Sequence, residues 1–492
     1  MIVAETTGPH SFRVIDRERE RVKLGAGAFR SGRLRPETMD AALSALSRFA
    51  LLAQRLQVDR VLAVATSAVR EAANGKQFLA TVKAETGIDA RTISGDDEAR
   101  LIYTGVRHAV HLNGRRGLIL DLGGGSLEAI LGDSRRIWLA ESLPLGVQRL
   151  RDFFGAEDPL PRKAREALIA HVRKQAASVV ARTRKRGFDT VVLTSGTHLT
   201  LGLACLRLRG RDPWGSLNGY LIGTGELQDL SAQLLDLDAA GRMRLPGIDQ
   251  RRADTVHLGA AVLVTVLEML KAEEVQLCGA SLREGMVLQH LSRKNGAAGE
   301  PDVRRASALD LLRRLGGDEK RAAHLAGLAL QIFDGARQAH GLAREYRSLL
   351  EAAGLLEDLG RAIHLHDREH LAYQIIRGGG LRGFSDRELE IVGLTARYSR
   401  RGAPKPRHRH YSELEPDDRH VVKILAGIMR IADGLDRGRG SVVREVRCRR
   451  RGGTLVLQCG TRGNAELELF SARRATQLLE QAMDTDIAIE RA

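Results

Sequence analysis

One short segment, LILDLGGGSLE at residues 118–128, restricts the fold of this 492-residue chain more than any other. Its apolar residues predict a buried strand that carries Asp121 to a turn of three glycines and Ser126. Glycines allow backbone amides to approach the oxygens of an anion closely, and a carboxylate at a strand end can hold a hydrated magnesium ion. An ordinary glycine-rich hairpin is the alternative for three glycines alone. The flanking aspartate and serine favour an anion site.

A second loop of similar character follows another strand-like run. Four residues, Thr194, Ser195, Gly196 and Thr197, come between this run and the helical segment HLTLGLACL. Hydroxyls and amides at the start of a helix suit a bound anion. They suit plain N-capping equally well, so this segment alone leaves both interpretations open.

The order of patterns along the chain predicts several units. Strand-like runs alternate with helical stretches up to about residue 121, and a similar order recurs after it, which indicates a duplicated α/β fold with a ligand between its halves. The predicted units are residues 1–118 and 119–292, a polar linker at 293–304, an all-helical domain at 305–440 and a small α+β tail at 441–492. Strands are expected at 22–25 and 465–470, among others, and a last helix at 472–483.

Composition excludes some classes of protein. The longest nearly apolar stretch, around 258–270, is shorter than the roughly 20 residues of a membrane span, and the first residues have no secretion signal, so a cytoplasmic protein is expected. The four cysteines form no CxxC pair that would indicate zinc or a redox centre. The 77 Lys and Arg residues against 61 acidic residues favour anionic partners, although an arginine-rich proteome explains the excess equally well.

Eight segments occur together and in order: ERVKLGAG (20–27), AVATSAVREAANG (63–75), ISGDDEARLIYTGV (93–106), DLGGGSLE (121–128), SLPLGVQRL (142–150), TSGT (194–197), LNGY (217–220) and SLREGM (281–286). Over residues 1–292 the chain resembles the exopolyphosphatase and guanosine pentaphosphate phosphohydrolase family, which belongs to the actin, sugar-kinase and heat-shock ATPase superfamily. In weaker form the resemblance extends to an HD-like helical domain, through GFSDRELEIV and RIADGLD.

The resemblance implies an actin-like (ribonuclease H-like) fold and a hydrolase that releases terminal phosphate from polyphosphate or guanosine pentaphosphate. It implies that Glu98, rather than its neighbour Asp97, is the general base that activates water. Asp121 would hold Mg²⁺, directly or through water, and Glu128 would support the metal shell.

Phosphate binding is implied for several further residues. Gly123, Gly124, Gly125 and Ser126 would cradle the terminal phosphates, and residues 194–197 would form a second phosphate loop. Two arginines in family-like segments, Arg70 and Arg283, would neutralise substrate charge; surface salt bridges are the alternative for both.

The start of the chain departs from the family. Family members open with an Asp-x-Gly-Ser-Asn-Ser type loop, whereas residues 2–25 resemble the strands that follow such a loop. We therefore expect an upstream frame that encodes roughly 15 to 25 further residues, about one strand and a phosphate turn. The alternative is a catalytically weakened homologue that binds polyanions or has a regulatory role.

The helical domain also departs from the family pattern. Glu357 and Asp358 stand where an HD site would have a His-Asp pair, and the pair in HLHD (364–367) lies in a downstream loop. His340, His370 and Asp433 are other candidate ligands. Because a carboxylate in place of an imidazole changes the charge and geometry of the site, we expect no working second hydrolase, and a domain that serves substrate binding or dimerisation instead.

The densest basic stretch is RYSRRGAPKPRHRH, at 397–410. It is either a solvated loop or a track for long polyphosphate that includes Arg400, Arg401 and Arg407. Only Tyr398 and Tyr411 are near it, so stacking on nucleic-acid bases is not expected.

Overall fold

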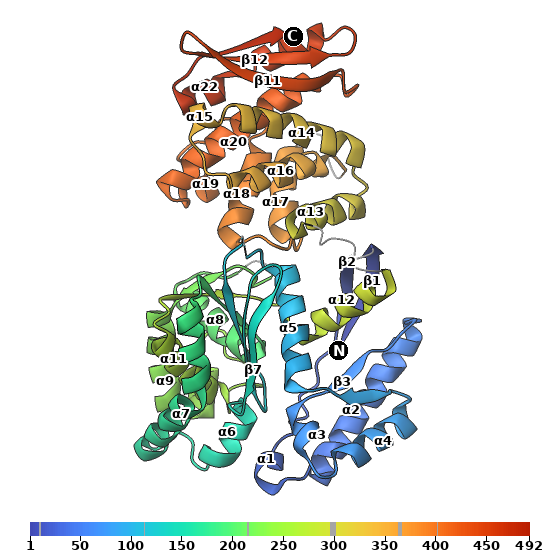
Figure 1. Cartoon of the computed structure of the whole chain (residues 1–492), viewed down its shortest axis with the longest axis vertical. Coiled ribbons are helices and arrows are strands. Elements are labelled where there is room, and N and C mark those ends of the chain that lie inside the picture. The colour runs from blue at the N-terminus through green and yellow to red at the C-terminus, as the bar shows by residue number, and fades with distance from the viewer. Residues whose placement is uncertain (9–10, 113, 214–215, 296–301, 363–366, 401) are drawn as a thin grey trace. The chain divides into compact units, whose positions relative to one another are not determined.

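The computed structural model describes residues 1–8, 11–112, 114–213, 216–295, 302–362, 367–400 and 402–492. The chain forms two compact units, Met1–Glu300 and Pro301–Ala492, coloured blue to yellow and yellow to red (Figure 1). Each unit has hydrophobic core of its own. The two halves predicted at 1–118 and 119–292 both lie within the first unit, and their boundary stays a prediction.

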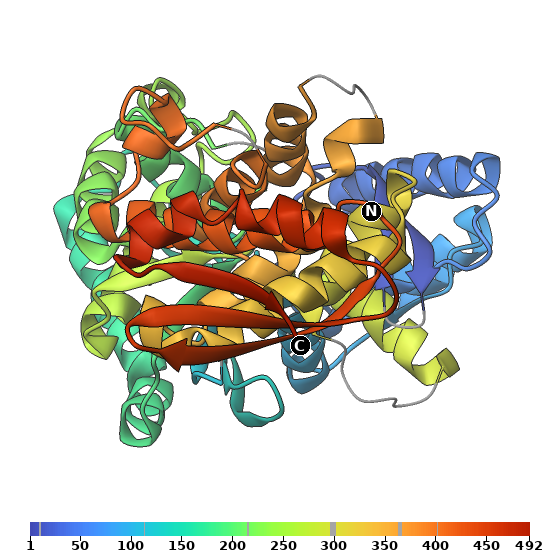
Figure 2. The same ribbon diagram turned by 90° about the horizontal axis from the view of Figure 1, so that it is seen from above.

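A six-stranded mixed sheet organises the first unit. Its strand order is β7-β6-β5-β8-β10-β9, in which β5, β8 and β10 run parallel while β6 and β9 are antiparallel to their neighbours. Helices cover both faces (Figures 1 and 2). The strands are β5 (Gly117–Leu122), β6 (Leu127–Gly132), β7 (Ile137–Leu143), β8 (Thr190–Thr194), β9 (Leu221–Gly223) and β10 (Glu274–Leu277).

The side chains of β5 point alternately to the two faces of this sheet. Leu118, Leu120 and Leu122 belong to the core shared with α7 (Arg162–Arg186) and α11 (Val256–Leu270). Ile119 lies on the other face, in the core shared with α5 (Gly95–Ala109). Because successive side chains of a strand point to opposite faces, Asp121 lies on the α5 side too.

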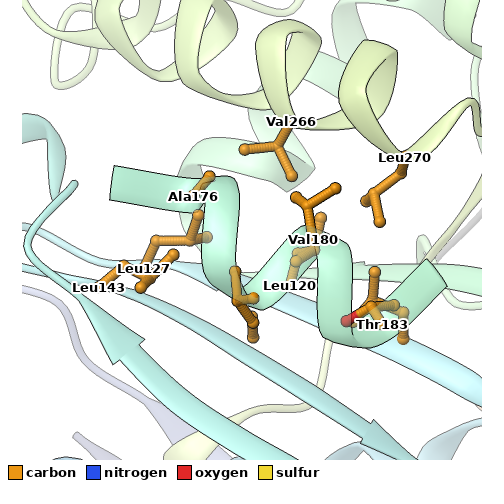
Figure 3. Close-up of a pocket in the computed structure, with 11 residues that line it drawn as sticks. Leu120, Leu127, Leu143, Ala176, Val180, Thr183, Val266 and Leu270 are labelled. Atoms are coloured by element: carbon orange, nitrogen blue, oxygen red, sulfur yellow. The ribbon is translucent and has the colours of Figure 1, made fainter. Parts of the chain in front are cut away.

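The pocket in Figure 3 lies on the opposite side of the sheet from Asp121. It has a volume of about 10 Å³, roughly one water molecule, between the sheet and helices α7 and α11. Its lining is apolar except for Thr183, as the labelled side chains of Leu120, Val180 and Val266 illustrate. It is a packing gap rather than a site for an anion.

The N-terminal part of the first unit contains two small sheets. Strands β1 (Ile2–Gly8) and β2 (Ser11–Arg17) form an antiparallel pair, and β3 (Ala63–Ala65) and β4 (Ala90–Thr92) a parallel pair. The accompanying helices are α1 (Ala28–Ser31), α2 (Pro36–Arg55), α3 (Ser67–Glu71) and α4 (Gly75–Thr86). The α/β class is thus confirmed, while duplication of one domain stays a prediction.

The strand predicted at 22–25 is wrong. Lys23 has φ of 53° and Gly27 has φ of 73°, both in the left-handed region. A strand requires extended backbone, and this segment instead turns into α1.

The second unit is a helical bundle followed by a small α+β tail. The bundle helices are α13 (Val303–Arg314), α14 (Glu319–Gly335), α15 (Arg337–His340), α16 (Tyr346–Leu356), α17 (Arg368–Gly378), α18 (Asp386–Arg397), α19 (Arg409–Ser412) and α20 (Pro416–Leu435), with a 3₁₀ turn at Leu359–Ala362. The tail is a sheet of order β11-β12-β13 (Val443–Arg451, Thr454–Thr461, Ile487–Arg491) with α21 (Glu466–Arg473) and α22 (Gln477–Met483).

The strand predicted at 465–470 is wrong, because this segment forms most of α21. Leu469 and Ala472, three residues apart, are buried, while Leu467 and Phe470 are exposed. This helical spacing of buried residues, which includes a residue beyond the predicted strand, prevails over the local alternation in AELELF. Across the described ranges, no helix has both the length and the apolarity to cross a bilayer.

Candidate active site

Glu98 and Asp97 are neighbours at the start of α5, but their environments differ. The hydroxyl of Ser94, the N-cap of α5, accepts the N–H of Asp97 at 3.0 Å and donates to its carboxylate at 2.8 Å. Asp97 is exposed and engaged in capping, whereas Glu98 is only 7% exposed. Of the two acids, Glu98 alone is placed as a buried base would be.

Asp121 and Glu128 are direct neighbours across the β5–β6 ladder. The hydroxyl of Ser281 donates a hydrogen bond to Asp121, and that of Ser142 donates to Glu128 at 2.8 Å. Within the described ranges, no Lys or Arg side chain lies within 4.0 Å of either carboxylate. Both acids are buried, and serines rather than cations contact them.

Glu98, Asp121 and Glu128 interact electrostatically, and we call them the carboxylate cluster. Burial raises the pKa of Asp121 to about 6 and that of Glu98 to about 7, and the charge of Asp121 adds to the rise at Glu98. Burial and then the charges of Glu98 and Asp121 raise the pKa of Glu128. Such shifts place a carboxyl group near the pH at which a general base works best.

Arg70 is the cation nearest to this cluster. Its Nη1 donates to the carbonyl of Ile93 at 2.6 Å and lies 3.5 Å from Glu98 Oε2. Its charge and its hydrogen bond lower the pKa of Glu98, but less than burial raises it. The sequence-based placement of Arg70 beside the site therefore agrees with the geometry.

The glycine loop, residues 123–126, connects β5 to β6 as a hairpin turn. Its carbonyls accept hydrogen bonds from the first turn of α6 (Val147–Phe154) and from Arg149 Nε. No hydrogen bond among the described residues uses the amides of residues 124–126. The loop is thus a hairpin turn, which was the alternative interpretation of the three glycines. Its amides are also free to bind an anion.

The second loop extends the same edge of the sheet. Thr194 pairs with Asp121 across the β5–β8 ladder and donates its hydroxyl hydrogen bond to the carbonyl of Ala280 at 2.7 Å. Ser195 caps α8 (Gly196–Leu208) by accepting the N–H of His198. Capping therefore occurs, and it also places the loop beside Asp121.

A guanidinium that sequence reasoning missed lies over this second loop. A Cβ at Gly196 would lie 1.9 Å from Arg252 Nη2, so the guanidinium lies directly against the glycine and a larger residue there would displace it. Arg252 Nη1 donates to Thr197 Oγ1 at 3.5 Å. The only sequence signal was the pair Arg251-Arg252 shortly before the apolar helix α11.

We use the name arginine group for Arg19, Arg252 and Arg283, which form no ion pair with a described residue. Within the described part of the chain, none of them lies within 4.0 Å of a carboxylate. Burial lowers the pKa values of both Arg252 and Arg283; the nearby charges of Asp249 and Glu284, respectively, raise them, and the charge of Arg19 lowers both. Arg252 and Arg283 are partly buried, whereas Arg19 is exposed. Cations that form no close ion pair favour a site for an anionic ligand.

Other residues that support the site were also missed. Ser281 holds Asp121, and Arg149 joins the glycine loop to Glu71 through hydrogen bonds of 2.7 and 2.8 Å. A Cβ at Gly125 would lie 1.9 Å from Ser67 Oγ, which explains the glycine there. Family-like segments contain these residues, but only the fold assigns their contacts.

The carboxylate cluster fits a magnesium ion that is shared with a substrate. In the described ranges Asp121 and Glu128 have no Lys or Arg side chain within 4.0 Å, and a divalent ion would supply the cation that they lack. Among the described residues, no three His, Cys, Asp or Glu side chains are arranged to hold a metal ion by themselves. Mg²⁺ typically takes one or two carboxylates, waters and substrate phosphates, which agrees with such an open site.

Both units match sequence models of known protein families. The sequence model of the Ppx/GppA phosphatase family matches residues 2–294, and that of Ppx/GppA phosphatase domain III matches residues 303–470. An uncharacterized protein of Streptomyces coelicolor is 36% identical over 273 residues, which cover 55% of this chain and 80% of that protein.

Two solved structures are similar as well. A crystal structure of an exopolyphosphatase from Cytophaga hutchinsonii has a TM-score of 0.56 and 27% identity, and the match covers 59% of this chain and 94% of that one. The Aquifex aeolicus member of the Ppx/GppA family has a TM-score of 0.51 and 25% identity, with 60% and 94% covered.

Proposed function

The chain belongs to the Ppx/GppA phosphatase family, as the eight sequence segments predicted, and from this premise we propose that its first unit hydrolyses terminal phosphoanhydride bonds of a polyanionic substrate. The observation that carries the proposal is the buried Glu98, whose pKa burial raises to about 7, in one cluster with Asp121 and close to unused loop amides.

Glu98 acts as the general base. An ionised Glu98 accepts a proton from a water molecule while the water oxygen bonds to the terminal phosphorus and the bond to the bridging oxygen breaks. The bridging oxygen leaves with the electron pair of that bond, as part of the shortened substrate. Arg70, 3.5 Å from the carboxylate, keeps the base oriented.

The remaining groups bind and neutralise the phosphates. The amides of residues 124–126 and the second loop would receive the terminal phosphate, and the arginine group would bind the phosphates that follow it. Asp121 and Glu128 would hold Mg²⁺, which neutralises charge on the phosphate oxygens when it is bound. Ser281 and Ser142 orient these two carboxylates.

Inorganic polyphosphate is the substrate that we propose first, and guanosine pentaphosphate the second. The similar Cytophaga hutchinsonii protein is an exopolyphosphatase, which supports the first choice. Three arginines that form no ion pair within 4.0 Å in the described part of the chain suit a ligand whose charge extends over several phosphates. A cytoplasmic location and a homodimer stay predictions.

Phosphate release tests this proposal. The full chain would be incubated with polyphosphate, with guanosine pentaphosphate, and with polyphosphate plus single-stranded RNA as competitor, each in Mg²⁺ or in EDTA. We expect Mg²⁺-dependent release from polyphosphate that RNA inhibits only weakly. Binding of polyphosphate without release would instead identify a polyanion-binding homologue, and absence of both would refute the proposal.

A further inference from the structure

The second unit buries four carboxylates in one place, which we call the acidic pocket. Two of them follow α16, and the other two lie at the end of α20 and just after it. Glu357 and Asp436 are almost completely buried, with side-chain exposures of 1% and 0%. The four acids are Glu357, Asp358, Asp433 and Asp436.

Arg400 occupies one side of the acidic pocket. Its Nε and Nη2 donate to the two oxygens of Glu357 at 3.0 and 2.9 Å, a bidentate pair. The same Nη2 lies 2.7 Å from Asp433. Its side chain is only 8% exposed, so the guanidinium is a buried part of the bundle.

Arg321, on α14, is the second buried cation. Its guanidinium lies 2.8 Å from Asp358, 3.3 Å from Asp436 and 3.6 Å from Asp433. The side chain is 11% exposed. Together the two arginines contact all four acids. Asp358, the most exposed of the four, has further ion pairs with Arg361, Arg368 and Arg439 at 3.9, 3.6 and 3.2 Å.

Buried carboxylates are stable only when cations neutralise them. A divalent metal ion is one solution, since carboxylate oxygens are its usual ligands. Here the two guanidinium groups lie between the acids, and among the described residues no three metal-binding side chains are placed to share an ion. A metal ion would have to displace the bidentate contact of Arg400 with Glu357. The residues present therefore do not fit a metal at this place.

From these contacts we propose that Arg321 and Arg400 are the built-in cations of the acidic pocket, and that their ion pairs take the place that a divalent metal ion would otherwise fill. The acidic pocket is then an internal ion-pair network that stabilises the helical bundle and has no need of a metal ion.

The experiment compares variants of the full chain that all carry Asp121→Asn, which weakens cation binding in the first unit. Arg400→Met and the double variant Arg321→Met/Arg400→Met remove one or both of the buried guanidinium groups. Arg400→Lys keeps a charge but loses the bidentate fork, and Arg407→Met removes an exposed arginine of the same basic stretch as the matched control. Bound Mn²⁺ per chain after desalting and the melting temperature with Mn²⁺ or EDTA are the measurements.

We expect the parent and Arg407→Met to retain no Mn²⁺ and to melt alike in Mn²⁺ and EDTA. Arg400→Met should melt several degrees lower in EDTA, because it leaves Glu357 buried without its partner. Mn²⁺ should not restore that loss, and the double variant should melt lower still and retain no ion. Arg400→Lys, which keeps the charge but not the bidentate contact, should melt between the parent and Arg400→Met.

Three results would overturn the proposal: a parent chain that holds about one metal ion after desalting, an Arg400→Met variant that melts with the parent, or methionine variants that Mn²⁺ returns to the melting temperature of the parent. Methionine variants that fail to fold in either condition would support it, provided that Arg407→Met folds normally.

Discussion

The two buried acid clusters of this chain solve the same electrostatic problem differently. Among the described residues, one guanidinium lies within 4.0 Å of the carboxylate cluster of the first unit: that of Arg70, at 3.5 Å from Glu98. In the acidic pocket of the second unit, two arginines contact all four acids at distances from 2.7 to 3.8 Å. The first cluster, in which Asp121 and Glu128 have no such ion pair, suits a cation that arrives with a ligand, whereas the acidic pocket already contains its cations.

The arginines of the two units also differ in whether they form ion pairs within the protein. In the described part of the chain, Arg252 and Arg283 form no ion pair within 4.0 Å, so they are available to an anionic substrate. Arg400 belongs to the basic stretch 397–410, yet it is used within the bundle. The proposed polyphosphate track therefore cannot include Arg400, and this prediction is corrected; Arg401 lies outside the described residues. Tyr398 and Tyr411 are buried and unavailable for stacking.

The largest expected effect is the loss of turnover in Glu98→Gln. If Glu98 is the base of an open cluster, phosphate release should decrease at least about a hundredfold while polyphosphate binding persists. Asp97→Asn is the matched control, because it changes the adjacent exposed acid. Steady-state release and equilibrium binding would be measured for both. Near-normal turnover in Glu98→Gln would assign the base elsewhere.

A smaller effect is expected from Arg252→Met. Removal of one unpaired guanidinium should lower kcat/KM for long polyphosphate by about tenfold, as for the loss of one charge-assisted contact. It should also make activity less sensitive to added salt. Arg251→Met, which changes the exposed neighbouring arginine, should remain near wild type. Equal losses in the two variants would indicate a general effect of charge instead of a contact in the site.

The smallest expected effect concerns stability and pH in the absence of Mg²⁺. Burial raises the pKa of Glu98 from 4.5 to about 7, so the folded protein holds a proton that the unfolded chain has already lost between these pH values. Ionisation of Glu98 therefore costs stability progressively as the pH rises through this window, and the full cost is present above it. Glu98→Gln should melt a few degrees higher than wild type at pH 8 and about the same at pH 4.5.

The acidic pocket should behave in the opposite way. Glu357→Gln removes the bidentate partner of Arg400, so it should lower the melting temperature at pH 8. Melting curves of both variants at the two pH values provide the measurement. Two shifts of the same sign would remove the distinction between an open and a closed cluster.

Sequence determined the parts of this protein that depend on local order. The strand, glycine turn and strand of LILDLGGGSLE place Asp121 and Glu128 as cross-strand neighbours, because alternation and a short turn suffice to pair them. Eight segments in order identified the family, and their register selected Glu98 over Asp97. These features are encoded by residues close together in the chain or by recurring motifs.

Tertiary structure alone decided which distant side chains meet. Arg252 lies over Gly196, and Ser281 holds Asp121 across 160 positions of the chain, contacts that no local pattern contains. Arg400 has the sequence environment of a solvated cation, yet packing brings it to Glu357, 43 positions earlier. A charge run specifies how many cations are present, whereas burial and the position of acidic partners decide whether each one stabilises the fold or remains available to a ligand.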